Sequence, residues 1–368
     1  MRRAWWALAG LALALLVSAG AVSAWAWRTL HAPYRGYAAE AADVEVEPGL
    51  DARAILELLE RDGVLADARL TRIYLVQVLD DAPLKAGDYR FEGALNAPQV
   101  LDKLIRGEVR THPVTLVEGL TLEETAQRLA EAGFGEYETL RALMQDPERI
   151  ADLDPAAETL EGYLFPDTYS FARRTPEPAV VDVLVETFRR RFRDEVAPLL
   201  EAADERPVRE IVTLASIVEK EARLADERPL IAGVFANRLR RGMPLQADPT
   251  VIYALTSLGR WDGNLRRPDL QVDSPYNTYR YPGLPPGPIA SPGLASLQAA
   301  ARPAGEPYLY FVSRNDGSHV FANTLAEHNR NVNRWQKEYW RRRWAEERRA
   351  AAAQRAAPKP EEEKAPPG

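Results

Sequence analysis

The segment Thr213 to Ala222, TLASIVEKEA, places two glutamates beside small and apolar residues. Carboxyl groups both donate and accept protons, so either glutamate could perform general acid/base chemistry. The spacing predicts a helix in which five apolar residues form one buried stripe, namely Ile211, Leu214, Ala215, Val218 and Ala222. At about 100° per residue, Glu219 and Glu221 project to different sides of that stripe. They cannot readily share a proton, so a catalytic carboxylate here acts alone.

Glu219 also has a purely structural interpretation. It precedes Arg223 by four residues, the favourable orientation for an exposed helical ion pair worth about 0.2 to 0.5 kcal/mol. The helical period alone favours this ion pair over catalysis.

Two further carboxylates lie in the aromatic segment from Leu160 to Phe171, LEGYLFPDTYSF. Gly162 and Pro166 disfavour a regular helix there. Glu161 and Asp167 are therefore candidate site residues. The alternative is a structural loop whose aromatic rings fill the core.

The segment from Met243 to Tyr253, MPLQADPTVIY, joins two predicted helices. Asp248 is expected to be the N-cap of the second helix, with Pro249 at the first helical position. Capping would suffice to explain Asp248. Nothing local requires an amide at Gln246, which is therefore a candidate ligand contact.

A polar aromatic run, Ser274 to Tyr281, precedes the proline-rich segment from Gly283 to Gly293. About 20 residues without helical or strand pattern exceed an ordinary connection. Stiff loops that present tyrosines and amides suit sugar recognition, because pyranose faces stack on aromatic rings and hydroxyl groups need directional partners. Tyr276 and Asn277 are thus candidate sugar contacts; the alternative is a proline-rich brace around the core.

The composition of the 368-residue chain excludes several kinds of site and makes some partners unexpected. It has no cysteine, which removes disulfides and thiolate catalysis, and its four histidines are scattered. We therefore expect neither a metal nor a cofactor. A net charge of -7 gives no global attraction to nucleic acid, which we do not expect as a partner.

The residues from Ala4 to Trp27 carry no charge, a length sufficient to span a hydrocarbon core of about 30 Å. Tryptophans near both ends favour the two membrane interfaces. Arg2 and Arg3 indicate a cytoplasmic start and an extracytoplasmic remainder. A cleaved signal peptide, with small residues at 22–24, is the alternative.

We predict an α+β protein with an N-terminal transmembrane helix, a small βααβ subdomain and a larger mixed α+β domain. The predicted boundaries are a cytoplasmic N-terminus with a membrane anchor at 1–28, a linker at 29–43, the small subdomain at 44–112, the catalytic domain at 113–340, and a basic helix end with a disordered tail at 341–368.

Several motifs in one order resemble the YceG-like endolytic murein transglycosylases. They are LEGYLFPDTY at 160–169, ASIVEKE at 215–221, VFANRL at 234–239, LQADPTVIY at 245–253, YNTY at 276–279, GLPPGPIASPG at 283–293 and YLYFV at 308–312. The resemblance covers nearly the whole chain after the anchor. It does not explain the basic helix and acidic tail beyond Trp335.

This resemblance implies a LysM-like character for the small subdomain and cleavage within peptidoglycan glycan strands. It makes Glu219, the first glutamate of SIVEKE, the catalytic acid, which outweighs the ion-pair interpretation. The reaction would close a 1,6-anhydro ring on N-acetylmuramic acid, and we expect Glu219 to be partly desolvated for it. Glu161, Gln246, Asp248, Tyr276 and Asn277 are the expected substrate contacts. Penicillin-binding proteins are further partners that only the resemblance implies.

Three other functions compete with this one. A peptidoglycan hydrolase would need a second, water-activating carboxylate, with Glu161, Asp167, Asp248 and Glu221 as candidates. A non-catalytic scaffold would bind the wall through the LysM-like part. A pyridoxal-phosphate lyase would need a Schiff-base lysine, and Lys220 points away from the buried stripe, which argues against it.

Overall fold

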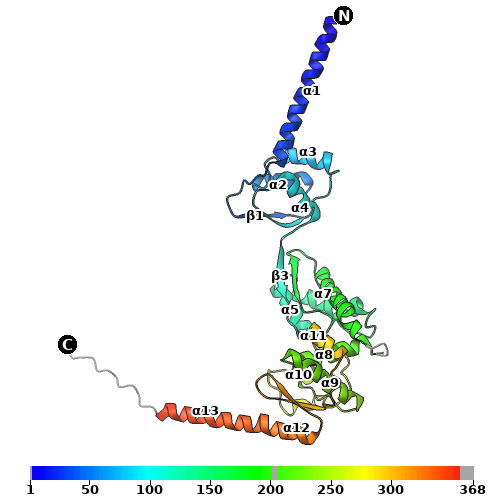
Figure 1. Cartoon of the computed structure of the whole chain (residues 1–368), viewed down its shortest axis with the longest axis vertical. Coiled ribbons are helices and arrows are strands. Elements are labelled where there is room, and N and C mark those ends of the chain that lie inside the picture. Colours follow the sequence, from blue (N-terminus) through cyan, green and yellow to red (C-terminus); the bar gives the residue numbers. More distant parts are fainter. Residues whose placement is uncertain (1, 201–205, 357–368) are drawn as a thin grey trace, which may run out of the picture. The chain divides into compact units, whose positions relative to one another are not determined.

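Helices predominate in the computed structural model, which describes residues 2–200 and 206–356 and is drawn in Figure 1. The fold is mixed α+β, as predicted, and strands within the described residues form three two-stranded sheets. The chain divides into two compact units. The first comprises residues 1–114 and 169–176, and the second comprises residues 115–168 and 177–368.

The first unit begins with α1 (Arg2–His31), whose segment Leu13–His31 is long and apolar enough to cross a membrane. There follow β1 (Ala41–Val46), α2 (Ala52–Arg61), α3 (Ala68–Val78), β2 (Gly87–Glu92) and α4 (Ala97–Arg106). β1 and β2 pair antiparallel, with Val44 opposite Tyr89. This order of strands and helices is the predicted one. The LysM-like character of the unit stays a prediction.

Side-chain caps explain where the helices of this unit begin. The Asp51 carboxylate accepts the backbone N–H of Ala54 at the start of α2, and Asp67 accepts that of Leu70 at the start of α3. Such caps satisfy backbone donors that the first helical turn leaves unpaired. The helices then bury their apolar faces in one core around Leu56, Leu59, Leu75, Phe91 and Leu101.

Two strands, β3 (Thr111–Thr115) and β4 (Thr168–Ala172), form a sheet where the chain passes between the units. The helices of the second unit are α5 (Leu122–Glu131), α6 (Tyr137–Gln145), α7 (Glu177–Arg191), α8 (Val208–Glu221), α9 (Arg228–Arg240), α10 (Asp248–Ser257), α11 (Leu294–Ala301), α12 (Leu325–Val332) and α13 (Tyr339–Ala356). A hairpin of β5 (Tyr310–Ser313) and β6 (His319–Ala322) lies between α11 and α12. Shorter turns are the 3-10 segments Pro147–Ile150, Ala197–Leu199, Ala225–Glu227 and Asp269–Gln271, and the π segments Phe192–Val196 and Asn333–Glu338.

Helix α8 is the central element of the second unit. Every residue from Ile211 to Val218 is buried, rather than the single stripe that the sequence predicts. The reason is that α8 packs against both α9 and α11, and a helix enclosed by neighbours buries its whole circumference. The core therefore reaches the last turn of α8, where Glu219 lies.

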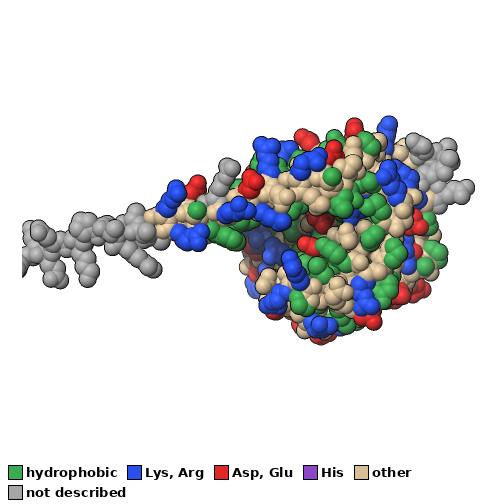
Figure 2. Space-filling view, turned by 90° about the horizontal axis from the view of Figure 1, so that it is seen from below, with side chains coloured by type: hydrophobic (Ala, Val, Ile, Leu, Met, Phe, Trp, Pro, Cys, Tyr) green, Lys and Arg blue, Asp and Glu red, His purple; other side chains and the backbone are tan. Residues whose placement is uncertain are grey.

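The end of the described chain is basic and aromatic. Arg334 lies over the ring of Trp335, and Arg343 lies over that of Trp340. Figure 2 shows Lys and Arg side chains distributed along this helix. The disordered tail predicted after Pro358 lies outside the described residues.

Candidate active site

Glu219 occupies the last turn of α8, directly after the buried segment that ends at Val218. Its side chain is only 6% exposed. Both carboxylate oxygens receive donors: Oε1 accepts from Arg228 Nη2 at 3.1 Å, and Oε2 accepts from the Gly293 N–H at 2.9 Å. The structure thus gives Glu219 the desolvated position expected from the sequence, together with two partners that the sequence did not reveal.

The competing ion pair between Glu219 and Arg223 does not form. Helix α8 ends at Glu221, and Ala222 is already extended, with φ -82° and ψ 122°. Arg223 therefore lies beyond the helix, where the four-residue helical spacing no longer applies. The partner of Glu219 is instead Arg228, at the first position of α9.

Two loops are held against α8 on either side of Glu219. Ser216 Oγ accepts the N–H of Ile289 at 3.1 Å, which fixes the proline-rich segment. Lys220 Nζ donates to the carbonyl of Gly119 at 3.0 Å, which fixes the turn before α5. The two loops also pair with each other, because the Gly119 N–H donates to the Ser291 carbonyl at 2.8 Å. A short run of α8 therefore determines how both loops meet at the carboxylate.

Glu118 is the site residue that the sequence analysis did not select. Its carboxylate lies 3.5 Å from Arg228 Nη2, the same nitrogen that contacts Glu219. Burial raises the pKa of Glu118, the negative charge of Glu219 raises it further, and Arg228 opposes both effects. The only signal in the sequence is the pair Glu118-Gly119, which is typical of a turn and does not by itself indicate chemistry.

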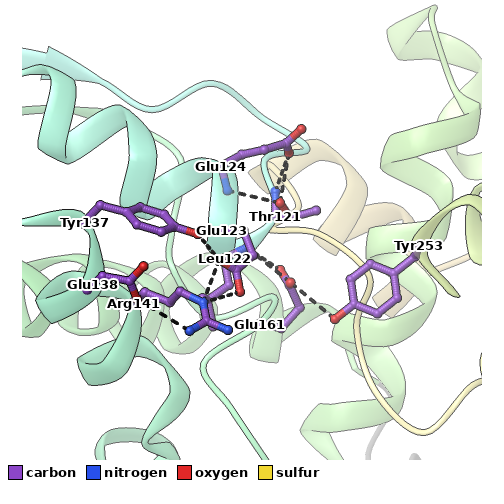
Figure 3. A network of polar contacts seen from close by, with 9 residues as sticks. All are labelled: Thr121, Leu122, Glu123, Glu124, Tyr137, Glu138, Arg141, Glu161 and Tyr253. Atoms are coloured by element: carbon purple, nitrogen blue, oxygen red, sulfur yellow. Dashed lines mark hydrogen bonds and ion pairs between the residues drawn. The ribbon is translucent and has the colours of Figure 1, made fainter. Parts of the chain in front are cut away.

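A second group of polar side chains surrounds Glu161, as Figure 3 shows. Glu161 is buried, and both of its oxygens accept the N–H of Leu122 at 3.1 Å. Tyr253 donates its hydroxyl to Glu161 Oε2 at 3.4 Å. Burial raises the pKa of Glu161 to about 8, an effect that these two donors only partly offset. Glu161 is therefore a neutral acid near pH 7.

The first turn of α5 positions this Leu122 N–H. Thr121 and Glu124 form a capping box, with the Glu124 carboxylate accepting the Thr121 N–H at 2.8 Å. Glu123, one residue before Glu124, accepts from Arg141 Nε at 2.8 Å (Figure 3). These contacts fix the start of the helix, and its free N–H groups favour a carboxyl group at that end.

Glu161 lines a cavity of about 170 Å³ together with Asp154, Arg209, Tyr253, Tyr276 and Pro286. The rings of Tyr253 and Tyr276 lie 4.9 Å apart. The cavity thus combines two aromatic faces with a neutral carboxyl group, a composition that suits the apolar faces and hydroxyl groups of a sugar. Of the predicted contacts, the structure brings Glu161 and Tyr276 together here.

Asp248 and Gln246 lie in a third place, at the start of α10. The N-cap expected at Asp248 is wrong by one residue: Ala247 is the cap, and Asp248 is the first helical residue. Asp248 instead accepts the Tyr279 hydroxyl at 2.6 Å. Its negative charge adds to burial, the larger cause, in raising the pKa of Glu221 to about 7. Gln246 is exposed, with a positive φ of 53°.

Asn277 is fully buried, and its amide is used within its own loop. Nδ2 donates to the carbonyls of Leu270 and Val272, and Oδ1 accepts the N–H of Tyr279. Both donors are therefore occupied in this structure. The amide shapes the loop that carries Tyr276, and direct sugar contact by Asn277 stays a prediction.

A metal-binding group of three or more His, Cys, Asp or Glu side chains does not occur among residues 2–200 and 206–356. Lys220 uses its ammonium group on a backbone carbonyl rather than on a neighbouring acid. Carboxyl groups near arginine and tyrosine, such as those described above, can transfer protons.

These features define an α+β protein with a nearly buried carboxylate at a helix end, which is its candidate acid/base site. The chain matches the YceG-like family over residues 44–334, and it belongs to that family. It is 32% identical to the endolytic murein transglycosylase of Bacillus subtilis over 313 residues, which cover 78% of this chain and 83% of the relative.

Two other relatives extend the comparison. An endolytic murein transglycosylase of Streptococcus pneumoniae is 31% identical over 319 residues, and the match spans only 57% of that longer protein. The crystal structure of a YceG-like protein from Listeria monocytogenes is 34% identical, with a TM-score of 0.53, and the match covers 79% of this chain and 98% of that one. The similarity therefore extends to the fold.

Proposed function

We propose that this protein is a peptidoglycan lytic transglycosylase that cleaves glycan strands internally, between N-acetylmuramic acid and N-acetylglucosamine. Family membership and the names of its relatives support the substrate and the reaction class. The observation that carries the proposal is the placement of Glu219, a nearly buried carboxylate at the meeting point of two loops on α8.

In the proposed reaction, Glu219 acts twice. As an acid it gives its proton to the glycosidic oxygen, and the bond from that oxygen to C1 of the muramoyl residue breaks. As a carboxylate it then takes the proton of the muramoyl C6 hydroxyl, whose oxygen bonds to C1 and closes a 1,6-anhydro ring. The substrate supplies the nucleophile, so one carboxylate suffices and no water is consumed.

Substrate contacts are proposed at Glu161, Gln246, Asp248, Tyr276 and Asn277. The cavity supports the roles of Glu161 and Tyr276, because it presents a neutral carboxyl group beside two aromatic rings. Exposure of the Gln246 and Asp248 side chains leaves them accessible to a polymer. Asn277 would act through the shape of its loop.

We further propose that α1 anchors the protein once in the cytoplasmic membrane, with the catalytic unit on the extracytoplasmic side. The apolar segment Leu13–His31 supports the anchor. This placement would bring the site to newly made glycan, where cleavage could set strand length beside penicillin-binding proteins. The LysM-like unit would contribute wall binding.

A hydrolase is the second candidate. It is favoured by Glu118, a further carboxylate within 3.5 Å of the arginine that contacts Glu219. Such a group could activate water, and the product would then carry a reducing end instead of an anhydro ring.

Mass spectrometry of peptidoglycan digested by the full chain in detergent distinguishes these activities. Wild type should release anhydro-muramoyl products, and Glu219→Gln should lower the rate by roughly 10²-fold to 10⁴-fold, the usual contribution of a general acid. Reducing ends from wild type would establish the hydrolase. Equal rates for both proteins would refute the role of Glu219, and binding without cleavage by either would favour a scaffold.

A further inference from the structure

Arg228 is shared between two carboxylates. Its Nη2 lies 3.1 Å from Glu219 Oε1 and 3.5 Å from Glu118 Oε2. Its Nε donates to Ser296 Oγ at 3.1 Å, so α11 holds the other side of the guanidinium. The Arg228 side chain is only 12% exposed, and its charge is therefore weakly screened by solvent.

The contacts seen at Glu219 suit a carboxylate. Both oxygens face N–H donors, from Arg228 and from Gly293. A protonated carboxyl group would have to turn its O–H toward the glycosidic oxygen instead. An acid can still accept both N–H groups through its remaining lone pairs, but the positive charge of Arg228 beside Oε1 favours the ionised form, and the Gly293 N–H belongs to the backbone at the start of α11. Arg228 is the donor that a side-chain movement can remove.

Glu118 is placed to receive it. Its side chain is 51% exposed and can move, whereas the turn that carries it is fixed by Lys220 and Ser291. Gly293 makes room for this carboxylate, because a Cβ at residue 293 would lie 2.8 Å from Glu118 Cγ and closer still to the carboxyl group. Any larger residue at position 293 would displace the Glu118 side chain from this place.

We propose that Glu118 is a positioning residue that draws Arg228 away from Glu219, so that Glu219 can hold the proton it donates. The inference rests on the proposed role of Glu219. Glu118 acts through Arg228 and need not touch the substrate. In the second step, Glu219 has become a carboxylate, and Arg228 returns to it. The Glu219 carboxylate then accepts the C6 hydroxyl proton.

The charged groups around Glu118 and Arg228 determine how the pH dependence of the reaction is interpreted. Lys220 on α8 lies against the Glu118-Gly119 turn, and Glu221 on α8 is half-buried near Asp248. Residues 282–293 and helix α11 carry no charged side chain. At the start of α9, Glu227 directly precedes Arg228 and pairs with His319 at 2.7 Å. Glu118 and Glu219 are the carboxylates that contact the Arg228 guanidinium.

The test compares the full chain with Glu118→Gln across a pH series, with kcat and KM measured on peptidoglycan. Without a negative charge at residue 118, Arg228 pairs only with Glu219 and favours its ionised form. The optimum should move about one pH unit lower, and kcat at neutral pH should fall about tenfold, since one unit changes the protonated fraction about tenfold. KM should change less than about twofold, because a purely positioning residue adds no uniform binding.

Two further variants separate this role from a structural one. Glu118→Asp keeps the charge and should keep the wild-type pH optimum. In an Arg228→Gln background, Glu118→Gln should have no additional effect, because the group through which Glu118 acts is gone. If Arg228→Gln does not fold, the comparison of Glu118→Asp with Glu118→Gln still decides the question. Glu210→Gln, an exposed change on the same helix, is the control and should match wild type.

Loss of kcat in Glu118→Gln with an unmoved pH optimum would overturn the inference, as would wild-type kinetics. A change from reducing to anhydro products in Glu118→Gln would also overturn it, since Glu118 would then act on water. Each of these results could occur while Glu219→Gln is inactive, so the proposed role of Glu219 would still hold. An active Glu219→Gln would refute the proposed function itself, so the two failures are distinguishable.

Discussion

Replacing Gly293 with alanine is the sharpest perturbation of the site, because it adds one methyl group and removes no polar atom. The backbone at Gly293 has φ -73° and ψ 169°, which alanine adopts without strain. The N–H that binds Glu219 is retained. The new Cβ would overlap the Glu118 carboxyl group and lie 2.8 Å from its Cγ. The three atoms nearest to it all belong to Glu118, so this side chain has to move.

The expected cost to folding is small. Glu118 is half exposed and can turn into solvent, and alanine in place of glycine at a helix N-cap costs about 1 kcal/mol or less. For a unit of this size, that lowers Tm by about 2 to 4 °C. Activity should instead fall about tenfold, as for Glu118→Gln, because the same carboxylate leaves Arg228.

Thermal unfolding and the rate of glycan cleavage, measured on one preparation, check both expectations. Gly305→Ala is the matched control, since a Cβ at residue 305 meets nothing within 4 Å. The double variant Gly293→Ala with Glu118→Gln should be no slower than either single variant. Full activity of Gly293→Ala, or losses that multiply in the double variant, would contradict the reasoning.

Two more predictions concern buried charge in the second unit. The pKa of Glu161 rises from 4.5 to about 8 on folding, so between these pH values the native state holds a proton that the unfolded chain releases, and stability falls as pH rises. In Glu161→Gln, Tm should fall less steeply between about pH 5 and pH 8 than in wild type. Glu221, whose pKa burial also raises, contributes a similar fall to both proteins. A fall as steep as that of wild type would refute the burial argument. Asp154 is 4% exposed and binds Arg209 and Tyr163 at 2.9 and 2.5 Å, so Asp154→Ala should cost about 3 kcal/mol in urea unfolding. Asp182→Ala, which breaks the exposed pair with Arg149, should cost less than about 1 kcal/mol, and equal losses would contradict the distinction.

Local pattern determined much of this protein from the sequence alone. The capping box at Thr121 and Glu124 follows from residue types three positions apart, and so does the start of α5. The βααβ order of the first unit follows from turn residues and from apolar periodicity. The helix that carries Glu219 was predictable for the same reason: its hydrogen bonds and its side-chain period are local.

Only the tertiary structure decided the partners of Glu219. Arg228, Gly293 and Glu118 come from three different segments, and no local period relates them. Burial was also decided there: residues Ile211 to Val218 of α8 are buried on every side, and burial raises the pKa of Glu161 even though the N–H at the start of α5 opposes that shift. Contacts between distant segments and the loss of solvent depend on how the chain packs, and a one-dimensional pattern records neither. The sequence could therefore select Glu219 as the candidate acid, whereas its contacts with Arg228 and Gly293 required the fold.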